Sequence, residues 1–255
     1  MLQKRIIPLL LLSENKIVKT EKFKNISYVG DPLNILKIFN EKEVDEIILL
    51  DISKRKKNYN LQTELLRQFA SECFMPISYG GGIETLEDAE FILNMGFEKI
   101  CLTNAALKNP KLIKEISDNF GKQSVVVKLD LKKNFFKKLK VYNYLDDNFI
   151  NENINDYIKK IISFGAGEII INFVDKEGTR SGLYKSDLEL IDLNIETPII
   201  ISGGINSYEN IKDLLSLKVD ALAVGSLLVY FGVHKAVLIS YPNKSEKKEL
   251  IKPIC

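Results

Sequence analysis

Histidine is nearly absent from this sequence. Its 255 residues include one histidine, His234. A single histidine argues against most histidine-based metal sites and against Ser-His-Asp triads. The chemistry of the protein must therefore depend on carboxylates, lysines, amides and the backbone. We expect neither a metal site nor a cofactor.

Cysteine is also scarce, and its pattern excludes two further classes of protein. Cys73, Cys101 and Cys255 are odd in number and do not have the spacing of metal ligands. A secreted disulfide framework normally has paired cysteines. We therefore predict a cytoplasmic protein whose cysteines are ordinary buried or terminal residues.

Neither basic nor acidic residues are in clear excess. The chain has 36 lysines and arginines against 34 aspartates and glutamates, so no overall field recruits nucleic acid or a membrane. The apolar run 6–12 is short for a signal peptide and no small-residue cleavage site follows it, which favours a buried first strand. The basic and aromatic run 132–138 is interpreted as a small hairpin, in preference to a nucleic-acid patch.

A repeated segment is the strongest positive signal. Residues 76–83, PISYGGGI, return 122 positions later as PIIISGGI at 198–205. Each copy continues into a second apolar strand that ends in small polar residues, and such ends expose backbone N–H groups to anions. The repeat predicts a small-molecule substrate with two phosphates, bound by Gly81, Gly82, Thr103 and Asn104 in one half and by Gly203, Gly204, Gly225 and Ser226 in the other.

Eight apolar runs alternate with stretches of helical periodicity. With 45% hydrophobic residues, this alternation predicts a (β/α)8 TIM barrel, with a doubly wound sheet as the second choice. We expect one domain over 1–255, built from half-barrels of roughly 1–122 and 123–255. The expected strands are 5–12, 46–51, 77–80, 99–102, 125–130, 168–173, 199–202 and 221–224, and the expected helices are 32–41, 60–71, 86–95, 110–119, 155–164 and 206–217.

Polar residues at the carboxyl ends of the strands are the candidate site, because active sites of barrels lie there. Asp130 ends an apolar strand and could transfer protons, although a structural cap is the alternative. Lys19 and Lys22 belong to a polar segment, 13–30, interpreted as a loop that folds over the ligand, although a solvated loop is the alternative. Further residues expected to contact substrate are Asp51, Asn172, Asp175 and Glu177.

Several motifs occur along the chain in the same order as in a known family. They are Met1-Leu2 with residues 4–7, Val18-Lys19, 30–32, 50–52, 80–83, 104–106, 125–127 with Asp130, 165–169, 178–179 with 181–182, and 202–204. Over nearly its whole length the chain resembles the cyclase subunit of imidazole glycerol phosphate synthase. The resemblance implies a bis-phosphorylated ribonucleotide substrate. It also implies ammonia supplied by a separate glutaminase subunit at the N-terminal face of the barrel, through a gate of charged residues that match Arg5, Glu46, Lys99 and Glu168.

One departure from the family concerns catalysis. The resemblance implies two aspartates as general acid and base, one of them Asp130, but the other position is Leu11. Leucine cannot transfer a proton, so family-type ring closure should be impaired. Smaller departures are the reversed order of Thr103 and Asn104 and Glu177 in place of an aspartate.

Other segments, including 8–12, 72–77 and 234–242, resemble a paralogous branch of the family that is associated with acetamidino sugars of surface glycans. We therefore favour an ammonia-using synthase subunit of that branch. A working histidine-pathway cyclase is the first alternative, and a non-catalytic scaffold or activator of the glutaminase is the second. The barrel isomerase of the preceding histidine-pathway step ranks below them, because it lacks the gate pattern.

Overall fold

The computed structural model describes residues 4–53 and 62–251. Met1, Leu2, Asn60, Leu61 and Cys255, which entered the expectations above, lie outside this range. Among the described residues, no helix is long and apolar enough to cross a membrane.

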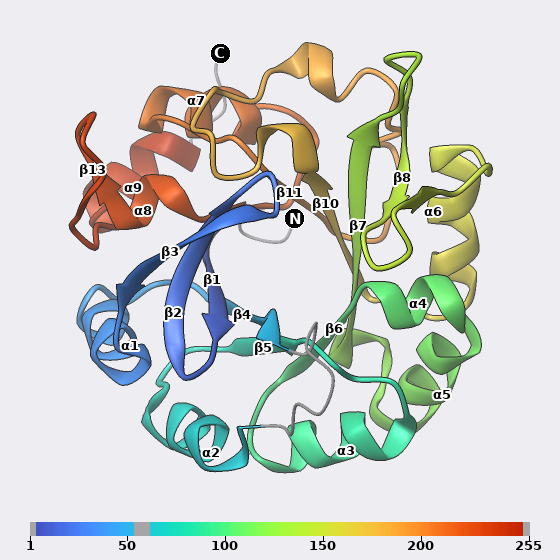
Figure 1. Ribbon diagram of the computed structural model, residues 1–255, viewed down its shortest axis with the longest axis horizontal. Helices are drawn as coiled ribbons and strands as arrows, with labels where there is room; N and C mark the ends of the chain where they lie inside the picture. Colours follow the sequence, from blue (N-terminus) through green and yellow to red (C-terminus); the bar gives the residue numbers. More distant parts are fainter. Residues whose placement is uncertain (1–3, 54–61, 252–255) are drawn as a thin grey trace.

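Eight parallel strands form a closed barrel, which confirms the predicted (β/α)8 fold (Figure 1). Each strand pairs with the next along the chain, β12 pairs with β1, and β7 pairs with β10, so the ring has no open edge. The barrel strands are β1 (Arg5–Ser13), β4 (Ile47–Asp51), β5 (Ile77–Gly80), β6 (Lys99–Leu102), β7 (Val125–Lys133), β10 (Glu168–Phe173), β11 (Ile199–Ser202) and β12 (Ala221–Val224).

Helices surround the strands as an outer layer (Figure 1). Their apolar faces pack against the outward side chains of the strands, while their polar faces point to water. The helices are α1 (Pro32–Glu41), α2 (Thr63–Glu72), α3 (Leu86–Asn94), α4 (Asn104–Lys108), α5 (Lys111–Phe120), α6 (Ile154–Ser163), α7 (Tyr208–Leu215), α8 (Ser226–Val229) and α9 (Lys244–Ile251), with 3₁₀ turns η2 (Lys122–Ser124), η3 (Val174–Lys176) and η4 (Lys185–Asp187).

Local sequence signals fix where several helices start. The Asp31 side chain accepts a hydrogen bond from the backbone N–H of Asn34, and Pro32 occupies the first turn of α1. Thr85 and Asp88 form a reciprocal capping box at the start of α3. Each cap places a helix directly after a strand-end loop, which leaves those loops free to build the mouth of the barrel.

The segment 13–30 corrects one expectation. It is not an irregular loop but a β-hairpin, β2 (Lys16–Glu21) and β3 (Lys24–Gly30), whose first strand pairs with the end of β1 through Leu11 and Val18. In Figure 1 this hairpin is blue and crosses the barrel. Both apolar residues of β2, Ile17 and Val18, are buried, which stabilises the hairpin in place of an open loop.

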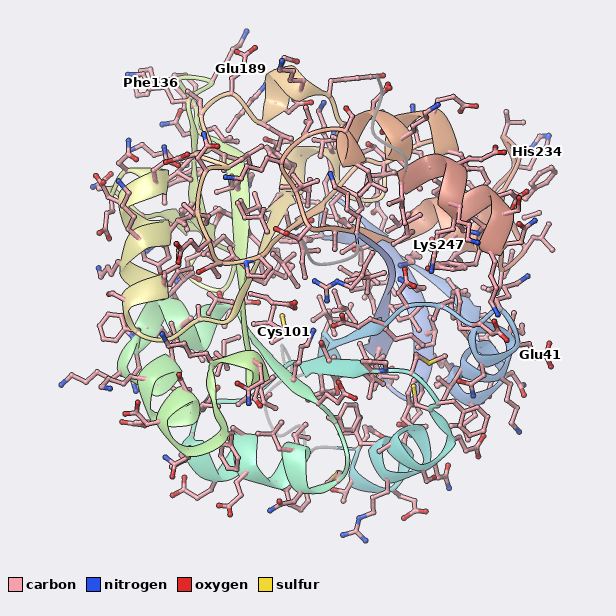
Figure 2. All side chains as sticks on the ribbon, turned by 180° about the vertical axis from the view of Figure 1, so that it is seen from behind. Glu41, Cys101, Phe136, Glu189, His234 and Lys247 are labelled. Atoms are coloured by element: carbon pink, nitrogen blue, oxygen red, sulfur yellow. The ribbon has the colours of Figure 1, made fainter. Side chains whose placement is uncertain are left out.

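The second hairpin follows β7 and was expected. Lys133 pairs with Leu139, so the turn at 134–138 joins β7 to β8 (Leu139–Asn143), and β8 pairs with β9 (Asn148–Phe149). A further small hairpin, β13 (Tyr230–Phe231) with β14 (Ala236–Val237), carries His234. His234 is exposed and lies at the edge of the molecule in Figure 2, so the one histidine is outside the barrel.

The interior of the barrel is an apolar cluster separate from the outer core. It contains Ile7, Ile48, Cys101, Val126, Ile170, Ile200, Ala221 and Ala223. Figure 2 places Cys101 near the centre of the molecule. The inward residues of β1 and β7 continue from this cluster toward the carboxyl ends of the strands, where the polar residues begin.

Candidate active site

A cavity of about 220 Å³ opens at the carboxyl ends of the strands. All eight barrel strands or the turns after them contribute to its wall. Most of the residues proposed from the sequence line this one cavity: Leu11, Lys19, Asp51, Gly81, Gly82, Thr103, Asn104, Asp130, Asn172, Glu177, Gly203, Gly204, Gly225 and Ser226.

The two copies of the repeat have the same backbone geometry. Gly81 and Gly203 have φ angles of 124° and 103°, and a Cβ atom would lie 2.3 Å from the carbonyl oxygen of Asp51 and 2.7 Å from that of Phe173. Both positions therefore require glycine. Thr103 before α4 and Gly225 before α8 also match, with φ and ψ of −123° and −86° against −103° and −92°.

These matched turns are the candidate anion sites of the cavity. Thr103 and Gly225 each precede a short helix whose first N–H groups have no partner within that helix. In the first copy the Oδ1 atom of Asn104 is buried and has no hydrogen-bond partner among the described residues. The geometry suits phosphate groups, which accept hydrogen bonds from backbone N–H groups.

Asp130 lies at the bottom of the cavity, 4% exposed. Its Oδ1 atom accepts a hydrogen bond of 2.7 Å from the Nδ2 atom of Asn172 on β10. The same oxygen forms an ion pair with the Nζ atom of Lys128. Sequence reasoning missed Lys128, which lines the cavity on the same face of β7 as Asp130. The period of two along a strand could have identified it.

Lys19 lies on β2 and not in a flexible loop. The side chain is 3% exposed and its Nζ atom donates a hydrogen bond to the carbonyl oxygen of Leu9. The Nζ atom also lies 2.8 Å from the position that a Cβ atom would take at Gly225, so its charge faces the second anion site. Burial lowers the pKa of Lys19 to about 8, against an attraction to Glu177 that raises it.

Glu177 holds the first hairpin over the cavity. Its carboxylate accepts hydrogen bonds of 3.0 Å from the Thr20 hydroxyl and from the Phe23 backbone N–H, and its carbonyl oxygen accepts one of 2.9 Å from the Lys22 N–H. Burial raises the pKa of Glu177, although the hydrogen bonds from Phe23 and Thr20 lower it. Lys22 thus helps to hold the hairpin through its backbone N–H and not through its side chain.

The two hairpins meet above the cavity. The ring of Phe23 contacts the ring of Tyr144 edge to face at a centroid distance of 5.4 Å. The Nζ atom of Lys128 lies 5.3 Å from the centre of the Phe23 ring. The tip of the first hairpin therefore shields the innermost charged residues of the cavity from water.

Two other predicted contacts differ in their surroundings. Asp51 lines the cavity, and its Oδ1 atom accepts a hydrogen bond of 2.8 Å from the backbone N–H of Ser53. Asp175 lies in η3 beyond the end of β10, outside the cavity lining, and its Oδ2 atom accepts a hydrogen bond of 2.8 Å from the Lys133 N–H. Asp175 thus ties η3 to the second hairpin.

A ring of charges closes the opposite end of the barrel. Arg5 contacts Glu46 at 2.6 Å and Glu168 at 2.8 Å, and Lys99 contacts the same two carboxylates at 3.0 Å each. The Oε1 atom of Glu46 also accepts a hydrogen bond of 3.0 Å from the Ser78 hydroxyl. The apolar interior cluster lies between this ring and the cavity.

A family model described as histidine biosynthesis protein matches residues 5–235. The chain belongs to this family. It is 36% identical over 230 residues to the imidazole glycerol phosphate synthase subunit HisF of Exiguobacterium sibiricum, covering 89% of this chain and 91% of the relative. The chain is thus a member of the HisF family.

Two other relatives have a higher identity. The chain is 44% identical over 244 residues to a protein of Pseudomonas aeruginosa provisionally named imidazole glycerol phosphate synthase subunit hisF2, covering 95% of this chain and 97% of the relative. It is 42% identical over 253 residues to one of Vibrio vulnificus provisionally named subunit hisF3, covering 98% and 97%. Both of these provisional names carry a number after the subunit name.

Proposed function

We propose that this HisF-family protein is the ammonia-using synthase subunit of a glutamine amidotransferase complex and acts on a substrate with two phosphates. The observation that carries the proposal is one cavity flanked by two glycine turns with matching backbone angles. Such turns bind phosphate through backbone N–H groups. Asp130 lines the same cavity and on this proposal transfers protons during bond formation at the bound substrate.

Ammonia enters, on this proposal, from a glutaminase subunit docked at the N-terminal face. Arg5, Glu46, Lys99 and Glu168 close that face as a ring of ion pairs, and a charge network can open and close as its pairs exchange. The apolar interior beyond the ring suits neutral ammonia, because an ammonium ion would lose its hydration there. The ring would thus serve as the gate between the two subunits.

The substrate is proposed to differ from that of the histidine-pathway cyclase. Leu11 lines the cavity with its side chain 7% exposed, where the family resemblance implies a catalytic aspartate. The relatives named hisF2 and hisF3 carry numbers such as additional copies receive. We assign the protein to the paralogous branch that serves the acetamidino sugars of surface glycans.

A direct assay tests this assignment. The purified protein is given an ammonium salt and the bis-phosphorylated aminoimidazole precursor, and imidazole product is measured. We expect little product from the wild type and a rise of about a hundredfold in Leu11→Asp, because a general acid or base typically contributes that much or more. Leu11→Asn is the matched control, since it adds a polar group that cannot carry the proton. Wild-type turnover like that of an ordinary cyclase would refute the assignment.

Two other functions make different predictions. A working histidine-pathway cyclase would restore growth of a cyclase-deficient strain, and Asp130→Asn would abolish that growth. A scaffold or activator of the glutaminase would keep glycan amidination unchanged in Asp130→Ala. The ammonia-using synthase loses amidination in that variant, because Asp130 is the proton-transferring carboxylate of the cavity.

A further inference from the structure

Lys128 is a buried charged residue of the cavity to which the proposed function gives no role. It lies on β7, 7% exposed, with the apolar residue Val126 below it on the same inward face. Burying an ammonium group costs free energy unless a partner compensates it. Asp130 is that partner. This ion pair explains how the buried amine is tolerated, but it does not explain why the amine lies in the wall of the substrate cavity.

The surroundings of Lys128 match those of an activated nucleophile. Such a site places a nucleophile within hydrogen-bond reach of a base, and a third group orients the base. Lys128 contacts Asp130, and Asn172 donates a hydrogen bond of 2.7 Å to the same carboxylate oxygen. Asn172 is 2% exposed, so the carboxylate is held in one orientation beside the amine.

We infer that Lys128 is a catalytic nucleophile that forms an imine with the carbonyl carbon of a phosphorylated ketone or aldehyde substrate. This inference rests on the proposed function and names the chemical class of the substrate. The two phosphate turns would hold the substrate, and Lys128 lines the same cavity. Lysine amines react with carbonyl groups in this way, and ammonia then attacks the imine carbon.

The steps balance without a further reactant. Asp130 accepts one proton from the Lys128 ammonium group, and the free amine attacks the carbonyl carbon. The carbonyl oxygen takes that proton from Asp130 and a second one from the attacking nitrogen and leaves as water, which gives a protonated imine. Ammonia adds to the imine carbon, and the bond to Lys128 breaks. Asp130 carries two protons, one after the other, from the new C–N nitrogen to the nitrogen of Lys128, which leaves as the ammonium group it was at the start, so the sum is a carbonyl compound and ammonia converted to an imine and water.

This chemistry accounts for two features of the cavity. A protonated imine is a stronger electrophile than a ketone, so ammonia can attack it without a second carboxylate at Leu11. The imine is also sensitive to hydrolysis and needs a site that excludes water. Phe23 at the tip of the first hairpin lies 5.3 Å from the Lys128 amine and supplies that cover.

Reductive trapping tests the inference on the complete protein. The protein is incubated with D-ribulose 5-phosphate, a ketone that carries one phosphate, and with sodium cyanoborohydride, which reduces imines to stable amines. We expect one adduct per chain, located on Lys128 by peptide mass spectrometry. Added ammonium chloride should suppress trapping, because ammonia displaces the lysine. An adduct confined to other lysines would overturn the inference.

Variants separate a nucleophile from a counter-ion. Lys128→Arg keeps the ion pair with Asp130 but forms no imine, so trapping should be lost. Asp130→Asn should slow trapping by roughly a hundredfold, the contribution of a general base. Lys132→Met removes the lysine over the Tyr142 ring, outside the cavity, and should trap like the wild type. Thermal melting followed by circular dichroism checks that each variant is folded.

Calorimetric titration with the same ketose phosphate separates a failure of the role inferred for Lys128 from a failure of the proposed function. Binding without any adduct would remove the role of Lys128 and leave the phosphate-binding synthase intact. Absence of binding at millimolar concentration would contradict the phosphate sites, and the proposed function would fall together with the inference. Binding with an adduct on Lys128 supports both.

Discussion

At the scale of single residues, Lys19 shows how the cavity holds a charge at a cost. Its amine is buried and faces Gly225, and burial lowers its pKa from the usual 10.5 to about 8. The folded protein at neutral pH therefore keeps an ammonium group in a place that disfavours it. On the proposed function, a substrate phosphate at Gly225 and Ser226 would neutralise this charge and offset that cost.

Substitution of Lys19 should reveal that cost as a pH-dependent stability difference. At pH 7 the amine is protonated in both states, and we expect Lys19→Met to be more stable than the wild type. Between pH 8 and pH 10.5 the folded chain has released the proton while the unfolded chain keeps it, so wild-type stability rises with pH. By pH 9.5 the difference should shrink by about 2 kcal/mol.

Urea unfolding at both pH values measures this difference, and comparing two proteins cancels every other titration. A difference in the free energy of unfolding between Lys19→Met and the wild type that stays constant from pH 7 to 9.5 would contradict a lowered pKa for Lys19. A difference that grows with pH would mean that the pKa is raised. Phosphate ions in the buffer must be avoided, because an anion at the second site would stabilise the ammonium group.

The residues of the site differ in how far sequence could find them. The glycines were predictable because the repeat places them in register and a side chain at Gly81 or Gly203 would strike backbone. The sequence shows only that Lys128 shares one face of its strand with Asp130, two positions further on. Its importance comes from contact with Asp130 and Asn172 on two strands, and that contact exists only after the barrel closes.

At the scale of elements, the first hairpin is the part of the fold that covers the site. It contacts the turn after β10 through Glu177, and the carbonyl oxygen of Thr20 lies 2.0 Å from the position a Cβ atom would take at Gly178. Gly178 also has a φ angle of 73°. This turn can therefore accept the hairpin only while residue 178 lacks a side chain.

Gly178→Ala should release the hairpin and leave the barrel closed. We expect faster amide hydrogen exchange in residues 16–30, above all at the N–H groups of Lys22 and Phe23 that bond to Glu177. Peptide-level exchange measured by mass spectrometry checks this. Gly232→Ala is the matched control, since Gly232 has a φ of 67° but no atom within 4 Å of the added Cβ. Equal exchange of residues 16–30 in both variants would refute the close contact.

The strand structure of the first hairpin was not predicted from the sequence, whereas the barrel strands were. The barrel strands could be located because each is a buried apolar run bounded by polar residues, and Ile77–Gly80 and Ile199–Ser202 have the predicted bounds. The segment 13–30 is rich in lysine and glutamate, and its charges concealed the pairing with β1. Its strand structure depends on burial of Ile17 and Val18 against the rest of the fold.

At the scale of the whole molecule, the charge ring ties together strands from both predicted half-barrels. Arg5, Glu46 and Lys99 belong to the first half and Glu168 to the second. Glu46 is 2% exposed, so its carboxylate depends on its partners to offset the loss of hydration. The division into repeated halves stays a prediction, but the ring gives it a measurable consequence, since a break on one side should weaken the closed barrel.

Lys99→Met should lower the free energy of unfolding by about 2 to 3 kcal/mol, somewhat less than the usual loss for a broken buried pair because Arg5 still contacts both carboxylates. Urea unfolding measures the loss, and Lys114→Met at the exposed pair with Asp118 should change stability by about 0.5 kcal/mol or less. Because the cost arises from an uncompensated carboxylate, Lys99→Met with Glu46→Gln should recover part of it. Equal losses in Lys99→Met and Lys114→Met would show instead that the ring does not stabilise the barrel.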